Sequence, residues 1–223
     1  MKMMKKTRII IVDDHKLVHH SIGQSLKMEK NFQVDAEADT GISAVALAAK
    51  HRPDISIMDI GMPGMNGMEA TRQILAVNPN IKILALTMHT EKIYIREMFN
   101  AGACGYILKS CAYNELLYGI KTVLSGKIYL SQDIAHLLTH QDKNTNKNHS
   151  KKEDGFSQLS CREREILQRV TEGHTSRKIA GELGISPKTV DIHRNNVKKK
   201  LGIHTIAGLT KFALARGLTS VTP

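Results

Sequence analysis

Long hydrophobic runs are absent from the 223-residue sequence. The apolar run at residues 9–12 is followed at once by two aspartates, whereas a membrane-spanning helix needs about 20 apolar residues. The first six residues include three lysines, but neither an apolar stretch nor a small-residue cleavage site follows them, as a signal peptide requires. We therefore expect a soluble, cytoplasmic protein with no membrane partner.

Cysteine is also scarce. Cys104, Cys111 and Cys161 are odd in number and form no C-x-x-C pair, which is expected where thiols stay reduced and gives little support for a redox or metal role. The composition of 41% hydrophobic and 24% charged residues excludes disordered and collagen-like classes for most of the chain. The length allows two small domains or one large one.

Charge is unevenly distributed along the chain. Residues 157–223 carry twelve Lys and Arg against five Asp and Glu, a net +7, whereas residues 1–138 carry only +3. Residues 139–155 contain no large apolar side chain, which is typical of a linker. We therefore expect a first domain at 7–125, a connecting helix and polar linker at 126–156, and a second domain at 157–220. A basic second domain favours an anionic partner such as nucleic acid, although a solvated basic surface is the alternative.

The first domain alternates short apolar runs with stretches of helical periodicity. We predict strands at 8–12, 33–38, 55–59, 82–87 and 105–108, and helices at 17–28, 42–49, 68–77, 93–101 and 116–124. Helical crossovers make the strands parallel, so the fold class is α/β with a five-stranded doubly wound sheet of order 2-1-3-4-5. Chemistry in such a sheet gathers at the carboxyl ends of strands one and three.

Three carboxylates occupy that place, because Asp13 and Asp14 follow the first strand and Asp59 ends the third. Like charges this close favour a cation, and Mg²⁺ bound to one or two carboxylates leaves room for a phosphate oxygen. Thr87 and Lys109, at the ends of the fourth and fifth strands, could both reach a phosphoryl group. The structural alternative is that Asp14 caps the first helix and the others are ordinary strand-end residues.

Four motifs of this domain resemble those of bacterial response-regulator receiver domains. They are residues 10–15 (IIVDDH), 58–67 (MDIGMPGMNG), 86–89 (LTMH) and 102–109 (GACGYILK). The resemblance implies that Asp59 accepts a phosphoryl group from a sensor histidine kinase. It also implies that Asp14, Asp59 and the Gly61 carbonyl hold Mg²⁺, with Asp13 assisting through water. The remaining implied roles are phosphoryl contact for Lys109 and switching for Thr87 and Tyr106.

Two positions depart from the receiver pattern. Gly61 stands where many members have a polar side chain. Because the implied magnesium ligand at this position is a backbone carbonyl, metal binding should be kept, and the property open to change is the lifetime of the phosphoryl group. Ser110 replaces the proline that often follows the lysine, so the usual cis peptide is in doubt, because a non-prolyl cis bond costs ~2.5–4 kcal/mol.

The second domain is predicted to be all-α with four helices. Ser160 and Glu163 form a capping box that opens a helix to about residue 171. A short helix from Thr175 or Ser176, a turn at Gly184, a helix at 187–201 opened by a serine–proline pair, and a helix at 205–216 follow. Two helices joined by a tight glycine turn, the second rich in Lys, Arg and Asn, indicate a helix-turn-helix.

Residues 159–167 (LSCREREIL), 184–190 (GISPKTV), His193 and 200–203 (KLGI) resemble the LuxR-type DNA-binding domain. Joined to a receiver, the chain resembles the NarL/FixJ class of response regulators. Carried over by position, base edges would be read by Asp191, Ile192 and Asn195, and phosphates contacted by Lys188, Thr189, Arg194, Lys198 and Lys199.

Asp191 is unusual in that class, where lysine is common. A carboxylate accepts from cytosine N4, so the preferred site should differ from that of better-known relatives. The alternative is an intrahelical pairing of Asp191 with Asn195 or with neighbours of Arg194. We expect Val190 and Val197 to be core residues.

The whole chain is therefore interpreted as a phosphorylation-switched transcription regulator and not an enzyme, apart from self-phosphorylation and self-dephosphorylation at Asp59. In this class, the resemblance implies, the unphosphorylated receiver masks the recognition helix, and phosphorylation frees the protein to dimerise on double-stranded DNA with inverted-repeat half-sites. RNA polymerase is a further candidate partner.

Two other functions are compatible with the acidic strand ends and the helix-turn-helix sequence. A phosphatase could use a strand-end aspartate on this fold, but its D-x-D motif is absent because Asp13 is followed directly by Asp14. A DNA-binding regulator whose receiver is only a dimerisation module remains the main alternative.

Overall fold

The computed structural model describes residues 6–140, 155–156 and 158–219. The chain divides into two compact units, residues 1–143 and 144–223, which are described separately. Among the helices of the described residues, none has the length and apolar character needed to cross a bilayer. Cys104, Cys111 and Cys161, all within the described residues, form no disulfide.

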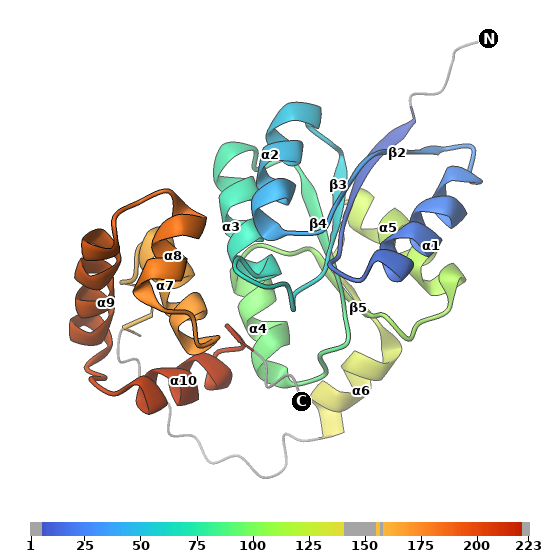
Figure 1. The fold of residues 1–223 in the computed structure, drawn as a ribbon. Coiled ribbons are helices and arrows are strands. Elements are labelled where there is room, and N and C mark those ends of the chain that lie inside the picture. The colour runs from blue at the N-terminus through green and yellow to red at the C-terminus, as the bar shows by residue number, and fades with distance from the viewer. Residues whose placement is uncertain (1–5, 141–154, 157, 220–223) are drawn as a thin grey trace. The chain divides into compact units, whose positions relative to one another are not determined.

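The first unit is a parallel α/β sheet (Figure 1). Its elements in chain order are β1 (Thr7–Val12), α1 (Lys16–Lys27), β2 (Phe32–Ala38), α2 (Gly41–His51), β3 (Ile55–Met58), α3 (Gly67–Val77), β4 (Lys82–Thr87), α4 (Lys92–Asn100), β5 (Gly105–Leu108), α5 (Tyr113–Leu124), β6 (Tyr129–Leu130) and α6 (Gln132–His140). The strand order is β2-β1-β3-β4-β5-β6. The predicted fold class and the order of the first five strands are confirmed, and the sixth strand is a correction.

Helices cover both faces of the sheet because successive strand residues point to opposite sides. Ile10 and Val12 of β1 pack in a core with buried residues of α2, α3 and α4, while Ile9 and Ile11 pack in a second core with α1 and α5. Every residue of β3 and β5 is buried, which explains their short continuous apolar runs.

The segment expected to connect the domains begins as part of the first unit. β6 pairs with β5 through Gly105 and Tyr106, and Ile134 of α6 is fully buried in the core that contains α4. Helix α6 runs to His140, two residues into the stretch expected to be linker. The rest of that stretch, up to residue 154, lies outside the described residues.

The described part of the second unit contains four helices, as predicted: α7 (Cys161–Thr171), α8 (Ser176–Leu183), α9 (Pro187–Leu201) and α10 (Ile206–Ala215). The Ser160–Glu163 capping box is present. Gly184 ends α8 in the left-handed region with φ 64°, and Ser186 caps α9 with Pro187 in its first turn. Val190 and Val197 are buried, which confirms them as core residues.

Glu163 does more than close the capping box. Its Oε2 accepts from the Ser160 backbone N–H at 2.8 Å and from Lys200 Nζ at 2.7 Å, and only 3% of the residue is exposed. Although burial opposes it, the hydrogen bonds from Lys200 and Ser160 lower the pKa of Glu163 below its usual value. The carboxylate therefore ties α7 to the end of α9.

We expect Glu163→Gln to destabilise the second unit by about 1–3 kcal/mol at neutral pH, because the ionised acceptor makes stronger hydrogen bonds than an amide. A carboxyl whose pKa is lower in the folded than in the unfolded state stabilises the fold at pH values above its unfolded pKa. This stabilisation is lost as the pH falls through the folded pKa. The difference in calorimetric melting between wild type and variant should therefore shrink below about pH 4. A difference that widens in acid would contradict this assignment.

Candidate functional site

Two buried carboxylates and one lysine meet at the carboxyl ends of the strands. Asp13 follows β1, Asp59 follows β3 and Lys109 follows β5, and the sheet register brings the three together. Lys109 Nζ lies 2.8 Å from Asp13 Oδ2 and 2.7 Å from Asp59 Oδ2. Asp13 and Asp59 are 2% and 3% exposed, so Lys109 bridges two negative charges that are largely removed from water.

Burial dominates the electrostatics of this group. It raises the pKa of Asp59; the hydrogen bond and charge of Lys109 oppose the rise, and the charge of Asp13 adds to it. For Lys109, burial alone would lower the pKa, but its bonds to Asp13 and Asp59 outweigh burial and raise it. The lysine therefore stays protonated and offsets the repulsion between the two carboxylates.

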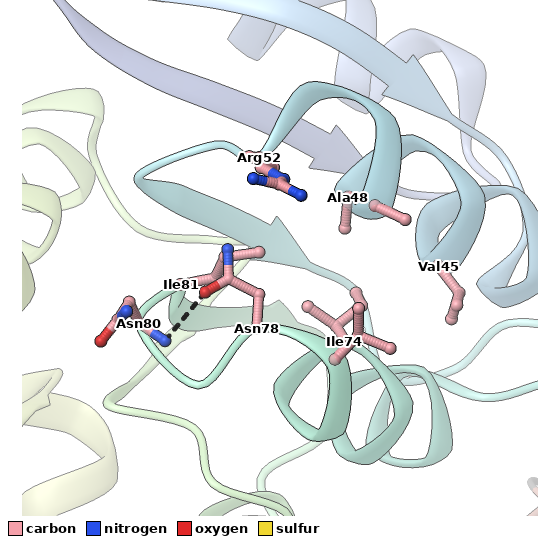
Figure 2. A pocket seen from close by; sticks show the side chains of 9 residues that line it. Val45, Ala48, Arg52, Ile74, Asn78, Asn80 and Ile81 are labelled. Atoms are coloured by element: carbon pink, nitrogen blue, oxygen red, sulfur yellow. Dashed lines mark hydrogen bonds between the residues drawn. The ribbon is translucent and has the colours of Figure 1, made fainter.

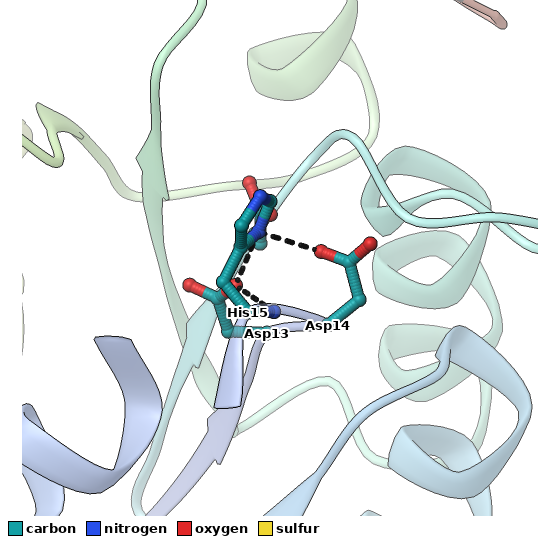
Figure 3. Close-up of side chains that lie close together, drawn as sticks. Asp13, Asp14 and His15 are labelled. Carbon is teal, nitrogen blue, oxygen red and sulfur yellow. Dashed lines mark hydrogen bonds and ion pairs between the residues drawn. The ribbon is translucent and has the colours of Figure 1, made fainter. Parts of the chain in front are cut away.

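Asp14 and His15 complete the cluster (Figure 3). His15 Nδ1 lies 3.1 Å from Asp13 Oδ1 and 2.9 Å from Asp14 Oδ1, and the side chain of Asp14 is 29% exposed. Residue His15, not Asp14, is the N-cap of α1, and its side chain makes no capping bond. The alternative that Asp14 caps the first helix is therefore wrong.

The cluster has the donor set of a divalent-cation site. One ligand atom from each of Asp13, Asp14, His15 and Asp59 lies within 4.8 Å of the others. Asp14 Oδ1 is buried, and within the described part of the chain it receives no hydrogen bond despite its closeness to the His15 ring. Carboxylate oxygens in this arrangement suit a hard cation such as Mg²⁺. His15 was missed as a group of this site, although it follows the aspartate pair directly.

The side chain of His89 lies close to Gly61, in space that a side chain at position 61 would need. A Cβ at Gly61 would come within 3.1 Å of His89 Nε2. The His89 ring stacks on Tyr94 of α4 with centroids 3.9 Å apart and an interplanar angle of 9°. Burial lowers the pKa of His89, partly opposed by Glu91, which favours the neutral imidazole. The sequence contained this histidine in its LTMH motif but gave no sign that it covers Gly61.

His89 also links the two predicted switch residues. Thr87 Oγ1 accepts from the His89 backbone N–H at 3.3 Å, and Tyr106 Oη donates to the His89 carbonyl at 2.9 Å. Thr87 and Tyr106 are fully buried. The Thr87 and Tyr106 hydroxyls are therefore connected through the backbone of His89. At Ser110 the peptide is trans, since no cis peptide occurs in the described residues.

Two hollows of the first unit differ in their relation to this cluster. The hollow in Figure 2, about 550 Å³, lies between α2 and α3 and is lined by Val45, Ala48, Ala49, Arg52, Ile74, Val77, Asn78, Asn80 and Ile81. It includes none of the predicted site residues. The other, about 380 Å³, lies between α1 and α5 and has Lys109 in its lining.

The residues predicted to contact DNA lie on α9, and most of them are accessible. Those exposed are Lys188, Asp191, Ile192, Asn195 and Lys199; those half-buried are Thr189, Arg194 and Lys198. Ile192 is 53% exposed, so its apolar side chain is accessible on the surface of α9. Asp191 accepts a hydrogen bond from Ser176 of α8. Within α9, and among the described residues, its charged partner is Arg194 at 3.8 Å and not Asn195.

Family models match both units. The response regulator receiver domain matches residues 9–121, and the family of bacterial regulatory proteins called luxR matches residues 157–213. The chain is 37% identical to the response regulator UvrY of Escherichia coli K12 over 94% of each protein. It is 34% identical to the oxygen regulatory protein NreC of Staphylococcus aureus RF122 over 95% of this chain and 98% of NreC.

Solved structures agree with these matches. A LuxR-family two-component response regulator from Aurantimonas sp. SI85-9A1 is 35% identical, with a TM-score of 0.59 over 61% of this chain and 97% of that chain. The RcsB response regulator of Salmonella typhimurium is 25% identical, with a TM-score of 0.58 over 94% of this chain and 98% of that one. Matches to both units and over nearly the full length show that this chain belongs to the NarL/FixJ class of two-component response regulators, which are DNA-binding proteins.

Proposed function

We propose that Asp59 accepts a phosphoryl group from a sensor histidine kinase and that this modification controls DNA binding by α9. One observation carries the proposal: Lys109 holds the buried Asp59 and Asp13 carboxylates together at the carboxyl end of the sheet, at 2.7 and 2.8 Å. An aspartate with one buried lysine and further carboxylates beside it can act as a nucleophile towards phosphorus.

In this proposal, an Asp59 oxygen forms the new bond to phosphorus while the bond to the kinase histidine breaks, and the imidazole leaves with the bonding pair. Asp14, Asp59 and the Gly61 carbonyl would hold Mg²⁺, with Asp13 assisting through water. The bound ion would supply positive charge to the phosphoryl oxygens. Lys109 would move one of its hydrogen bonds from Asp59 to a phosphoryl oxygen, so its charge remains paired throughout. The chain would catalyse only the phosphorylation and dephosphorylation of its own Asp59.

The added charge, roughly −1.5 to −2 by analogy with other phosphorylated side chains, would draw the Thr87 hydroxyl towards the phosphoryl group. The His89 N–H would then lose its acceptor, and the Tyr106 anchor on the His89 carbonyl would shift with it. Tyr106 and Ile134 of α6 share one buried core. The switch would thus reach the helix at which the connection to the second unit begins.

In the second unit, α9 would enter the major groove with Asp191, Ile192 and Asn195 towards the base edges. The proposed phosphate contacts are Lys188, Thr189, Arg194, Lys198 and Lys199. Phosphorylated protein would bind inverted-repeat half-sites as a homodimer in the cytoplasm, where RNA polymerase is a further candidate partner. Binding would weaken steeply with salt, because phosphate contacts dominate affinity.

The test is capture and sequencing of genomic DNA fragments by the full chain, with and without acetyl phosphate and Mg²⁺, at one salt concentration. Enrichment of fragments that share a short inverted repeat only after phosphorylation would support the proposal. Equal enrichment in both samples would contradict it and favour a regulator whose receiver serves only for dimerisation.

A further inference from the structure

Three polar side chains form a connected unit between α8 and α9. Ser176 Oγ donates a hydrogen bond to Asp191 Oδ1 at 2.7 Å. Ser176 Oγ also accepts a hydrogen bond from Arg194 Nη1, at 2.7 Å. Arg194 Nη1 and Asp191 Oδ1 are 3.8 Å apart, too far for a hydrogen bond between them. The Ser176 hydroxyl therefore stands between carboxylate and guanidinium and uses its donor and an acceptor site together.

The bridge fixes Asp191 without covering it. The Asp191 side chain remains 58% exposed and that of Arg194 24% exposed. Among the described residues, both contacts to Asp191 use Oδ1, so Oδ2 is available as an acceptor. Ser176 is the first residue of α8 and Asp191 lies in the second turn of α9. The orientation of the carboxylate thus depends on a different helix from its own.

We propose that Ser176 is a positioning residue for DNA sequence specificity, which holds Asp191 so that its free oxygen accepts from the N4 amino group of cytosine in one base pair of each half-site. This inference rests on the proposed function of α9. Of the major-groove edges, cytosine offers a donor at N4 and adenine a donor at N6 beside the acceptor N7, whereas guanine offers only acceptors and thymine an acceptor and a methyl group. A fixed carboxylate is therefore attracted most by cytosine, because N7 opposes it at adenine, and it is repelled by guanine and thymine.

The positive charge of Arg194 reduces the repulsion between the Asp191 carboxylate and the DNA phosphates. A lone negative charge on the binding helix would be repelled by phosphates, but the guanidinium 3.8 Å away offsets it. If the Ser176 hydroxyl were removed, the carboxylate would turn to Arg194 and pair with it directly, because nothing would separate them. Asp191 would then withdraw from the base edge, while the net charge of the surface would stay the same.

The consequence is a separation of specificity from affinity. Ser176→Ala should reduce the preference for cytosine at one position by about fivefold or more, in line with the discrimination that a single base contact supplies, and change the affinity for the best site much less. Ser176→Thr keeps the hydroxyl and should retain the preference. Asp191→Asn should also relax that position, because an amide offers a donor as well as an acceptor.

The experiment is selection of binding sites from a random duplex library by the full chain after phosphorylation with acetyl phosphate. Wild type, Ser176→Ala, Ser176→Thr and Asp191→Asn are compared with Lys199→Ala, which should weaken binding to all sequences alike without changing base preference. Melting curves of each variant confirm that it folds.

Relaxation at the same single position in Ser176→Ala and Asp191→Asn, with the preference retained in Ser176→Thr, is the expected result. The inference is overturned if Ser176→Ala selects the wild-type motif unchanged, or if the affected position prefers a base other than cytosine in the wild type. If the wild-type chain enriches no sequence at all, the proposed function of α9 fails and this inference fails with it. An unchanged motif in Ser176→Ala, or a preference for a base other than cytosine in the wild type, overturns this inference alone and leaves the proposed function intact.

Discussion

Asp59→Asn should abolish stable phosphorylation by acetyl phosphate in the presence of Mg²⁺. The amide oxygen can replace either Asp59 Oδ1, which accepts from the Ile60 backbone N–H at 2.7 Å, or Oδ2, which accepts from Lys109 at 2.7 Å. Lys109 also keeps Asp13 as a partner, so the local structure should persist. What the variant lacks is a nucleophilic carboxylate and one negative charge of the cation site. The phosphorylated fraction, read by intact-protein mass and by phosphate-affinity gels, should fall from most of the protein to none detectable.

Asp133→Asn is the matched control, since Asp133 is an exposed aspartate in the first turn of α6. It should be phosphorylated as the wild type is. Persistent phosphorylation of Asp59→Asn at the wild-type level would mean that another side chain is the acceptor and would remove the basis of the proposed function.

Lys109→Met should give the second large effect, on stability. The Lys109 side chain is 5% exposed and pairs with both Asp13 and Asp59. Removing one partner of a buried ion pair typically costs about 3–5 kcal/mol, because the other charge is left uncompensated. Here two carboxylates would be left facing each other without their cation. We expect a markedly lower melting temperature of the first unit in a chelating buffer.

Mg²⁺ should reverse much of this loss, because it offsets the same negative charge when bound. The stabilisation by Mg²⁺, measured as the shift in melting temperature between chelator and Mg²⁺, should therefore be larger for Lys109→Met than for wild type. Lys121→Met is the matched control, at an exposed position of α5. Its free energy of unfolding should stay within about 0.5 kcal/mol of the wild-type value. Equal melting of Lys109→Met and wild type in chelator would show that the lysine does not hold the carboxylates together.

Much of the receiver architecture follows from local patterns in the sequence. Short apolar runs separated by helical spacing give the five strands, and chain order places Asp13, Asp59 and Lys109 at strand ends on one edge. The carboxyl ends of parallel strands meet there, so convergence of these three groups required no knowledge of side-chain packing. The same holds for the helix boundaries of the second unit, where Ser160, Gly184 and Ser186 act as local signals.

Features that depend on contacts between distant elements were not predictable. Strand β6 is only two residues long and is defined by its pairing with Gly105 and Tyr106, so its own composition carries little signal. The approach of His89 to Gly61 brings together the loops that follow β4 and β3, and the His89 ring is held there by stacking on Tyr94 of α4. Ser176 and Asp191 are fifteen residues apart and meet only because α8 packs on α9.

The most direct measurement is the dissociation constant for a captured DNA fragment, determined for wild type and Asp59→Asn with and without acetyl phosphate and Mg²⁺ at one salt concentration. Coupling between two sites of a protein is typically about 5- to 150-fold in affinity. Phosphorylation should tighten binding of the wild type within that range and leave Asp59→Asn unchanged. Equal affinities of phosphorylated and unphosphorylated wild type would contradict the claim that Asp59 controls the binding of DNA by α9.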